Sequence, residues 1–129
     1  MDQVNKQFFN GRVVIESKDD KIEVRKITMK SGDEKTLLEF VGMRETVERN
    51  EEGQWVNGEP MRVTVKMWDV PEKVAELLKE GMVLIIRGTY IDEHFERKDG
   101  SEGHRQVLTA YTMGIDVVQP GLDSVNYKH

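Results

Sequence analysis

The sequence predicts an all-β domain, a small barrel of five strands with one helix between the third and fourth strands. Segments rich in aromatic and β-branched residues recur along the chain and are separated by turn signals. Only the segment following Asp69 changes to helical spacing. The chain has 129 residues, of which 37% are hydrophobic and 33% charged. This length and balance suit one domain with a single core.

Four strand-like segments precede the predicted helix and together make up the first three strands of the barrel. They cover residues 7–16, 21–29, 36–47 and 61–68, with a turn at Ser31-Gly32-Asp33. Gly42 predicts a kink where the barrel wall curves. Residues 48–60 read as a polar loop or hairpin tip, in which the turn signals Glu52-Gly53 and Asn57-Gly58 bracket Trp55.

A helix is predicted after the strand 61–68. Asp69 is placed as an N-cap, Pro71 falls in the first turn, and Glu72 supplies the acidic residue of a capping box. Gly81 predicts the C-terminal end of the helix. The apolar residues at helical spacing are Val70, Val74, Leu77 and Leu78.

Two further strands, residues 82–96 and 105–118, follow the helix and are joined by a flexible loop over residues 99–103. Three strands, a helix and two strands make the order of the OB-fold, a partly open five-stranded Greek-key barrel. Another small all-β barrel remains the alternative. We expect residues 1–120 to form this domain and residues 121–129 to form a short C-terminal tail.

Composition restricts the chemistry and the location of the chain. There is no cysteine, which excludes disulfides and thiolate metal sites. No apolar run approaches the roughly 20 residues that span a membrane, and residues 1–6 have no apolar signal core. We therefore expect a cytoplasmic protein. The net charge of −5 disfavours strong binding to phosphates, unless basic residues are segregated on one face.

Several segments, taken in order, resemble the bacterial single-stranded DNA-binding protein family. They are VNKQFFNGRV, EVR, VKMWDVPEKVAELLKEGMVLIIRGTY and HFERKDG, and together they cover about residues 4–118. The chain resembles a divergent member, because Val47 and Met61 stand where that family often has aromatic residues. Its C-terminal segment, GLDSVNYKH, does not match the acidic tail with which the family recruits partners.

This resemblance implies an OB-fold that binds single-stranded DNA without catalysis and without a cofactor or metal. It implies a role in DNA replication, recombination and repair in bacteria, or in a phage or plasmid. It also implies a homotetramer or homodimer paired through the first strand, with replication and repair proteins as candidate partners. The alternating apolar residues of the segment 7–15 are compatible with an edge that needs covering.

Stacking on bases requires flat aromatic side chains. The candidates are Trp55, Trp68, Phe95 and Tyr90, of which Trp68 and Phe95 lie where the family places stacking aromatics. Trp55 has an oligomer contact as its alternative role, and Trp68 and Tyr90 have core packing. The phenylalanines Phe8, Phe9 and Phe40 lie in apolar strands and are predicted to be core residues.

Binding to phosphates requires lysine and arginine. Each candidate has a solvated surface charge as its alternative interpretation. The candidates are Lys6, Arg12, Arg44, Arg62, Lys66, Arg87, Arg97, Lys98 and Arg105.

Catalytic interpretations find little support in the sequence. Asp92, His94 and Glu96 share one face of a predicted strand, which we interpret as a mixed-charge strand edge rather than a metal site. The loop Gly100-Ser101-Glu102-Gly103 lacks the lysine and threonine of a phosphate-binding loop. No pair of nucleophile and base is visible, so we predict no enzymatic activity.

Two other functions remain open at the level of sequence. An OB-fold can serve as a protein-interaction module with weak or no DNA binding, which the acidic charge favours. It can also bind RNA, since the fold serves both polymers.

Overall fold

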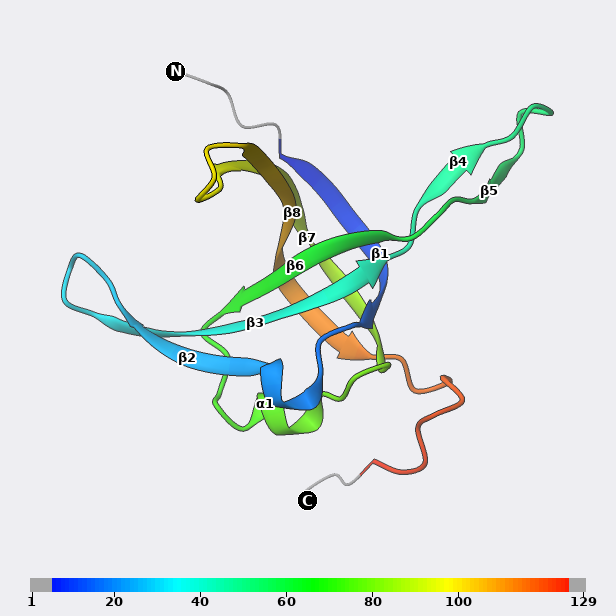
Figure 1. The fold of residues 1–129 in the computed structure, drawn as a ribbon. Coiled ribbons are helices and arrows are strands. Elements are labelled where there is room, and N and C mark those ends of the chain that lie inside the picture. Colours follow the sequence, from blue (N-terminus) through cyan, green and yellow to red (C-terminus); the bar gives the residue numbers. More distant parts are fainter. Residues whose placement is uncertain (1–5, 126–129) are drawn as a thin grey trace.

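A computed structural model describes residues 6–125 of the chain and shows a curved β-sheet with one short helix at its lower end (Figure 1). The main sheet has the strand order β1-β7-β8-β6-β3-β2, and β4 and β5 form a separate hairpin. The strands are β1 (Gln7–Ile15), β2 (Glu23–Thr28), β3 (Glu34–Arg44), β4 (Val47–Arg49), β5 (Trp55–Asn57), β6 (Met61–Trp68), β7 (Val83–Glu96) and β8 (Glu102–Ile115).

The sheet closes on itself because β1 pairs with two strands. β1 is antiparallel to β7 along most of its length, and its last residues pair with the end of β3, from Val13 opposite Arg44 to Ile15 opposite Gly42. β6 and β8 are parallel, whereas the other pairs in the main sheet are antiparallel. The five strands β1, β3, β6, β8 and β7 therefore enclose a barrel, and β2 extends β3 outside it. This arrangement confirms the predicted OB-fold.

The core fills this barrel with the inward side chains of all five strands. Because side chains alternate across a strand, every second residue points inward. The residues that are almost fully buried include Val13, Phe40, Val65, Leu84 and Leu108. Burying such side chains stabilises the fold by about 1.5–3 kcal/mol each.

Gly42 lies where β3 meets β1, at the seam that closes the barrel. A Cβ atom at this position would lie 2.5 Å from Cγ1 of Val13 and 2.9 Å from the carbonyl oxygen of Val14. A larger residue would therefore push the two strands apart. The sequence predicted a kink at Gly42, and the structure shows a close approach of two strands there.

The predicted helix is much shorter than its apolar pattern indicated. Helix α1 covers only Val74–Leu77, and its N-cap is Lys73 without a side-chain hydrogen bond. The capping box from Asp69 to Glu72 was therefore wrong. Asp69 instead has a left-handed backbone, with φ of 62°, and turns the chain away from the end of β6. Gly81 also has a positive φ, but it lies in a turn beyond the helix end at Leu77.

The hairpin predicted within residues 48–60 is present as β4 and β5, with Gly53 in its left-handed turn. Two other expectations need correction. The strand predicted over residues 36–47 ends at Arg44. Phe8, predicted as a core residue, is 85% exposed, whereas Phe40 is buried. Adjacent residues in a strand point to opposite faces, so Phe8 and Phe9 cannot both enter the core.

Residues 121–125 contain no helix or strand, and the remaining positions of the predicted tail lie outside the described residues. In the part of the chain that the structure describes, no helix has the length and apolar content needed to cross a membrane.

Candidate nucleic-acid interface

The outer face of β6 combines basic, polar and aromatic side chains. Val63 and Val65 point into the barrel and are buried, so the alternate residues Arg62, Thr64 and Lys66 point outward. Trp68 continues this row at the end of the strand and is 37% exposed. One strand thus presents two cations and a flat aromatic ring along about 20 Å of surface.

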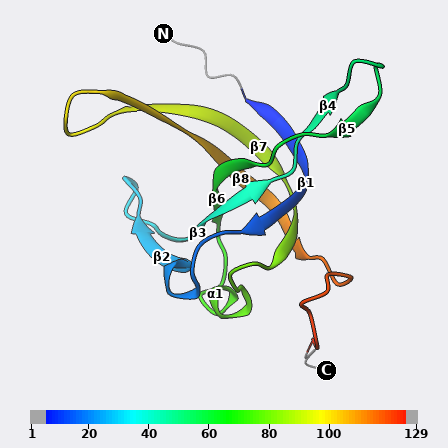
Figure 2. The same cartoon turned by 45° about the vertical axis from the view of Figure 1, so that its right-hand side comes forward.

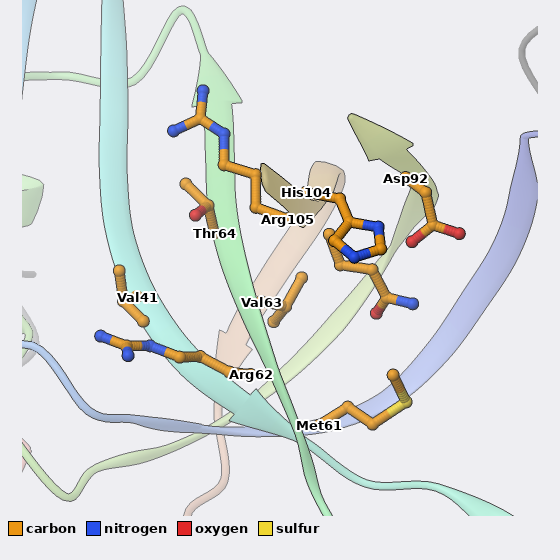
Figure 3. Close-up of a pocket in the computed structure, with 9 residues that line it drawn as sticks. Val41, Met61, Arg62, Val63, Thr64, Asp92, His104 and Arg105 are labelled. Carbon is orange, nitrogen blue, oxygen red and sulfur yellow. The ribbon is translucent and has the colours of Figure 1, made fainter. Parts of the chain in front are cut away.

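A cleft lies beside this row, between β6 and the hairpin formed by β7 and β8 (Figure 3). It has a volume of about 470 Å³, with Val41 and Val63 among its apolar lining residues. The hairpin reaches well beyond the barrel (Figure 2). Its residues Asp92, His104, Arg105 and Gln106 form the other wall of the cleft. The full lining consists of Val41, Met61, Arg62, Val63, Thr64, Asp92, His104, Arg105 and Gln106.

The two arginines of the cleft make only exposed ion pairs. Arg62 lies 3.6 Å from the carboxylate of Glu16, and Arg105 lies 3.3 Å from that of Glu93. All four side chains are at least two-fifths exposed. Exposed pairs of this kind contribute about 0–1 kcal/mol, so a phosphate can replace the carboxylate at little cost.

The tip of the β7–β8 hairpin carries three more of the predicted residues. Phe95 is 42% exposed, and its ring lies against Gly103 on the opposite strand, where a Cβ atom would come within 2.7 Å. The guanidinium of Arg97 lies 5.7 Å from the centre of that ring and donates a hydrogen bond to the carbonyl of Glu102. Lys98 is exposed at the turn. The tip therefore holds an aromatic ring with two cations beside it.

The turn of this hairpin is held by local hydrogen bonds. Both the hydroxyl and the backbone N–H of Ser101 donate to the carboxylate of Asp99, at 2.6 and 2.9 Å. These bonds lower the pKa of the Asp99 carboxyl. Gly100 follows with a positive φ of 86°, which a side chain would disfavour.

Trp55 lies on a separate projection, the β4–β5 hairpin, and is 64% exposed. One face of its ring is covered by the guanidinium of Arg49 at 4.8 Å, which leaves the other face for a partner. The surrounding sequence, ERNEEGQW, is rich in glutamate. These carboxylates disfavour phosphates near Trp55, so this hairpin differs in charge from the face of β6.

Two predicted residues lie inside the barrel mouth rather than on the interface. Arg44 is only 8% exposed, and its Nε donates a hydrogen bond of 2.8 Å to Oε1 of Gln106. Its guanidinium also lies 4.6 Å from the ring centre of Tyr90. Tyr90 is half-buried and donates its hydroxyl to Gln7. Arg44 and Tyr90 therefore have partners within the chain, and their contact with DNA stays a prediction.

Three other predicted cations belong to a different surface. Lys6 is exposed just before β1, while Arg12 on β1 and Arg87 on β7 point outward from the wall that these two strands form. Arg12 lies 3.6 Å from the carboxylate of Asp116. The structure thus does not bring Lys6, Arg12 and Arg87 together with Arg62, Lys66 and Arg105.

Sequence reasoning missed His104 and Gln106 as lining residues of the cleft. The hairpin register places His94 opposite His104 and Asp92 opposite Gln106. The sequence analysis predicted a flexible loop over residues 99–103, but β8 already begins at Glu102. Both pairs are equally spaced about Asp99, so a turn placed at Asp99-Gly100 would have given these partners.

The face of β7 that carries Asp92, His94 and Glu96 was interpreted from the sequence as a mixed-charge strand edge. Among residues 6–125, no group of three or more His, Cys, Asp or Glu residues is arranged to hold a metal ion. Nδ1 of His94 instead lies 3.1 Å from a carboxylate oxygen of Glu102, and its ring lies 5.2 Å from that of His104.

Comparison with known proteins supports the fold and leaves the family open. No protein-family model and no curated protein matches the sequence. The structure is similar to the small single-stranded DNA-binding protein from Streptomyces coelicolor, with a TM-score of 0.55 and 13% identity over 89% of this chain and 96% of that chain. Rim1, a mitochondrial single-stranded DNA-binding protein from S. cerevisiae, gives a TM-score of 0.38 and 18% identity over 88% and 95% of the two chains.

The chain is therefore an OB-fold protein, with a barrel of the kind found in single-stranded DNA-binding proteins. At 13% identity the similarity defines the fold alone.

Proposed function

We propose that this chain binds single-stranded DNA without catalysis, as a divergent relative of the bacterial single-stranded DNA-binding proteins. One observation carries the proposal: the row Arg62, Thr64, Lys66 and Trp68 on β6 lies beside a cleft whose far wall supplies Arg105. This is the strand face and loop pair with which OB-folds bind oligonucleotides. The Streptomyces protein of similar fold is itself a single-stranded DNA-binding protein.

The residues of this face match the chemistry of a single strand. Lysine and arginine neutralise phosphates and release counterions, which favours binding at low salt. Trp68 and Phe95 offer ring faces on which any base can stack, at about 1–3 kcal/mol per base, so sequence matters little to this part of the contact. Arg97 and Lys98 on the hairpin tip add two cations for the phosphate backbone of the DNA. We propose Trp55 as an additional contact on its separate hairpin.

We propose a biological role that is consistent with this chemistry. A protein that covers exposed single strands protects them during DNA replication, recombination and repair. We propose this role in the cytoplasm of a bacterium, or for a phage or plasmid, with replication and repair proteins as partners. The domain would comprise residues 1–120, followed by a short tail.

We further propose that copies of the chain associate through the wall formed by β1 and β7. This wall exposes Phe8 at 85%, Ile85 at 44% and Val14 at 40%, and Tyr111 on β8 is 57% exposed. Single exposed apolar residues are ordinary, but a group of them on adjacent strands favours an interface. A homodimer or homotetramer would cover them and leave the face of β6 free.

A second candidate function is a protein-interaction module. The β4–β5 hairpin favours it, because Trp55 is exposed among glutamates, and the whole chain has a net charge of −5. Tryptophan is enriched where proteins contact each other, and acidic surroundings suit a basic protein partner better than a phosphate backbone.

Tryptophan fluorescence distinguishes these functions. The protein is titrated with oligo(dT) of about 35 nucleotides, at about 50 and 200 mM salt. Quenching that saturates and weakens at the higher salt supports DNA binding. A flat trace at low salt contradicts it and favours the interaction module. Competition with an oligo(U) of equal length then separates DNA from RNA binding, because only RNA carries the 2′-hydroxyl.

A further inference from the structure

The cleft between β6 and the β7–β8 hairpin contains a carboxylate that phosphate binding does not explain. Asp92 lines the cleft together with Arg62 and Arg105. Within the described residues, the ion pairs of the hairpin join His94 to Glu102 and Arg105 to Glu93, so neither engages Asp92. A carboxylate without a cation partner repels a DNA backbone, so its presence here favours a ligand group that donates hydrogen bonds.

Gln106 lies directly opposite Asp92 on the neighbouring strand and lines the same cleft. Its Oε1 accepts a hydrogen bond from Nε of Arg44 at 2.8 Å. An arginine can only donate, so the side-chain oxygen of Gln106 must face Arg44. The NH₂ group of Gln106 therefore faces away from Arg44 and is available as a donor.

The cleft thus presents the NH₂ group of Gln106, a hydrogen-bond donor, next to the Asp92 carboxylate, which accepts hydrogen bonds through two oxygens. The Watson–Crick edge of guanine has the complementary order, since O6 accepts while N1–H and N2–H₂ donate. The Asp92 carboxylate can accept from N1–H and N2–H₂ at once, and the Gln106 NH₂ can donate to O6. Adenine, cytosine and thymine each offer a carboxylate only one donor on this edge.

The rest of the cleft fits an unpaired base. Its volume of about 470 Å³ exceeds that of a single base, and Val41 and Met61 supply an apolar surface. The imidazole of His104 lies beside the Asp92 carboxylate and offers a flat ring for stacking (Figure 3). Arg62 and Arg105 line the same cleft and supply cations for the phosphates beside such a base.

We propose that this cleft reads guanine, through Asp92 and Gln106, within an otherwise sequence-tolerant single-stranded DNA interface. The inference rests on the proposed function, because the cleft must first receive a single strand. It adds a base preference to stacking by Trp68 and Phe95, which does not distinguish the bases.

The test compares four oligonucleotides of about 16 nucleotides, a length that one OB-fold can cover. The first is oligo(dT), and the second carries dG at every fourth position, which avoids runs of guanine. The third replaces dG by inosine, which lacks the N2 amino group, and the fourth replaces it by 7-deazaguanine, which keeps the Watson–Crick edge. Affinities are measured by fluorescence anisotropy of labelled DNA.

We expect the dG oligonucleotide to bind at least about fivefold more tightly than oligo(dT), the lower range for a bidentate base contact. Inosine should lose most of this preference, and 7-deazaguanine should keep it. Asp92→Asn should abolish the preference, so that this variant binds the dG oligonucleotide and oligo(dT) with equal affinity. Gln106→Glu should also abolish it while still accepting the Arg44 hydrogen bond. Glu76→Gln on α1 is the control for the charge change of Asp92→Asn.

The outcomes separate this inference from the function on which it rests. Equal affinity of the wild-type protein for oligo(dT) and the dG oligonucleotide overturns the guanine site and leaves single-stranded DNA binding intact. Loss of preference with 7-deazaguanine overturns recognition of the Watson–Crick edge, because N7 is then the group being read. Failure to bind any of the four overturns both. A thermal melt of each variant shows whether it is folded.

Discussion

Two walls of the same barrel carry arginines, but they differ in what surrounds these arginines. On the β3–β6 wall, Arg62 lies in a row with Lys66 and Trp68 and borders a cleft. On the β1–β7 wall, Arg12 and Arg87 point outward beside the exposed Phe8 and Ile85, and Arg12 pairs with Asp116. The residue type is shared, so the neighbours decide the function: cations beside a ring and a cleft suit a nucleic-acid strand, and cations among apolar residues suit an interface between proteins.

The largest effect on DNA affinity should come from Trp68→Ala. It removes a ring from the β3–β6 wall and should cost about 1–3 kcal/mol of binding free energy for each base stacked on it. Tyr111→Ala is the matched control, because Tyr111 is the more exposed of the two, at 57% against 37%, but lies on the strand adjoining the other wall. The affinity for oligo(dT) is measured by anisotropy. Equal losses of affinity in the two variants would contradict the proposal that DNA binds the β3–β6 wall.

Arg44→Met tests how much the buried guanidinium of Arg44 contributes to the stability of the barrel. The change keeps an apolar stem but removes the hydrogen bond to Gln106 and the contact with the ring of Tyr90. Because Arg44 is buried, we expect the free energy of unfolding to fall by about 1–3 kcal/mol. Urea denaturation measures it. An unchanged unfolding midpoint would show that the guanidinium contributes nothing to the barrel mouth.

Smaller effects should follow from single arginine substitutions. Arg62→Ala or Arg105→Ala should reduce the slope of log affinity against log salt by about 0.7, the value for one phosphate contact with a single strand. Arg12→Ala and Arg87→Ala should leave this slope unchanged for a short oligonucleotide. If Arg87→Ala lowers the slope as much as Arg62→Ala, the strand also crosses the β1–β7 wall.

The smallest effect on DNA affinity should come from the apolar residues of the β1–β7 wall. Phe8→Ser combined with Ile85→Ser should leave the affinity for a short oligo(dT) unchanged and shift the mass of the protein toward the monomer in light scattering. The reason is that Phe8 and Ile85 are exposed and neither of them lines the cleft. A variant with the same mass as the wild-type protein would argue against association through this wall.

Much of the fold could be predicted because it depends on local patterns. The strands at residues 61–68 and 82–96 match β6 and β7 closely, since alternation and flanking turns define them within a few residues. The helix was overpredicted, because the chain leaves β6 through the left-handed Asp69 and has only four helical residues before it turns toward β7. Propensity and capping signals could not reveal this tertiary constraint.

The site was harder to predict than the fold, because the type of a residue does not show whether its side chain points into the barrel or to the outer surface. Arg44 continues the inward series Leu38, Phe40 and Gly42, so alternation would have placed it in the barrel, but we interpreted it as a phosphate contact. Arg62, Lys66 and Arg105 do lie together, across strands that are distant in sequence. The cleft itself depends on the packing of β6 against β8, which no local pattern contains.

The central claim is that single-stranded DNA binds the β3–β6 wall. The most direct measurement is a map of backbone amide chemical shifts during titration with oligo(dT) of about 16 nucleotides, a length within reach of one OB-fold. We predict that the shifts concentrate on residues 61–68 and on the hairpin from residue 92 to 105, with few on residues 7–14 or 85–89. Shifts concentrated on residues 7–14 and 85–89 would contradict the claim.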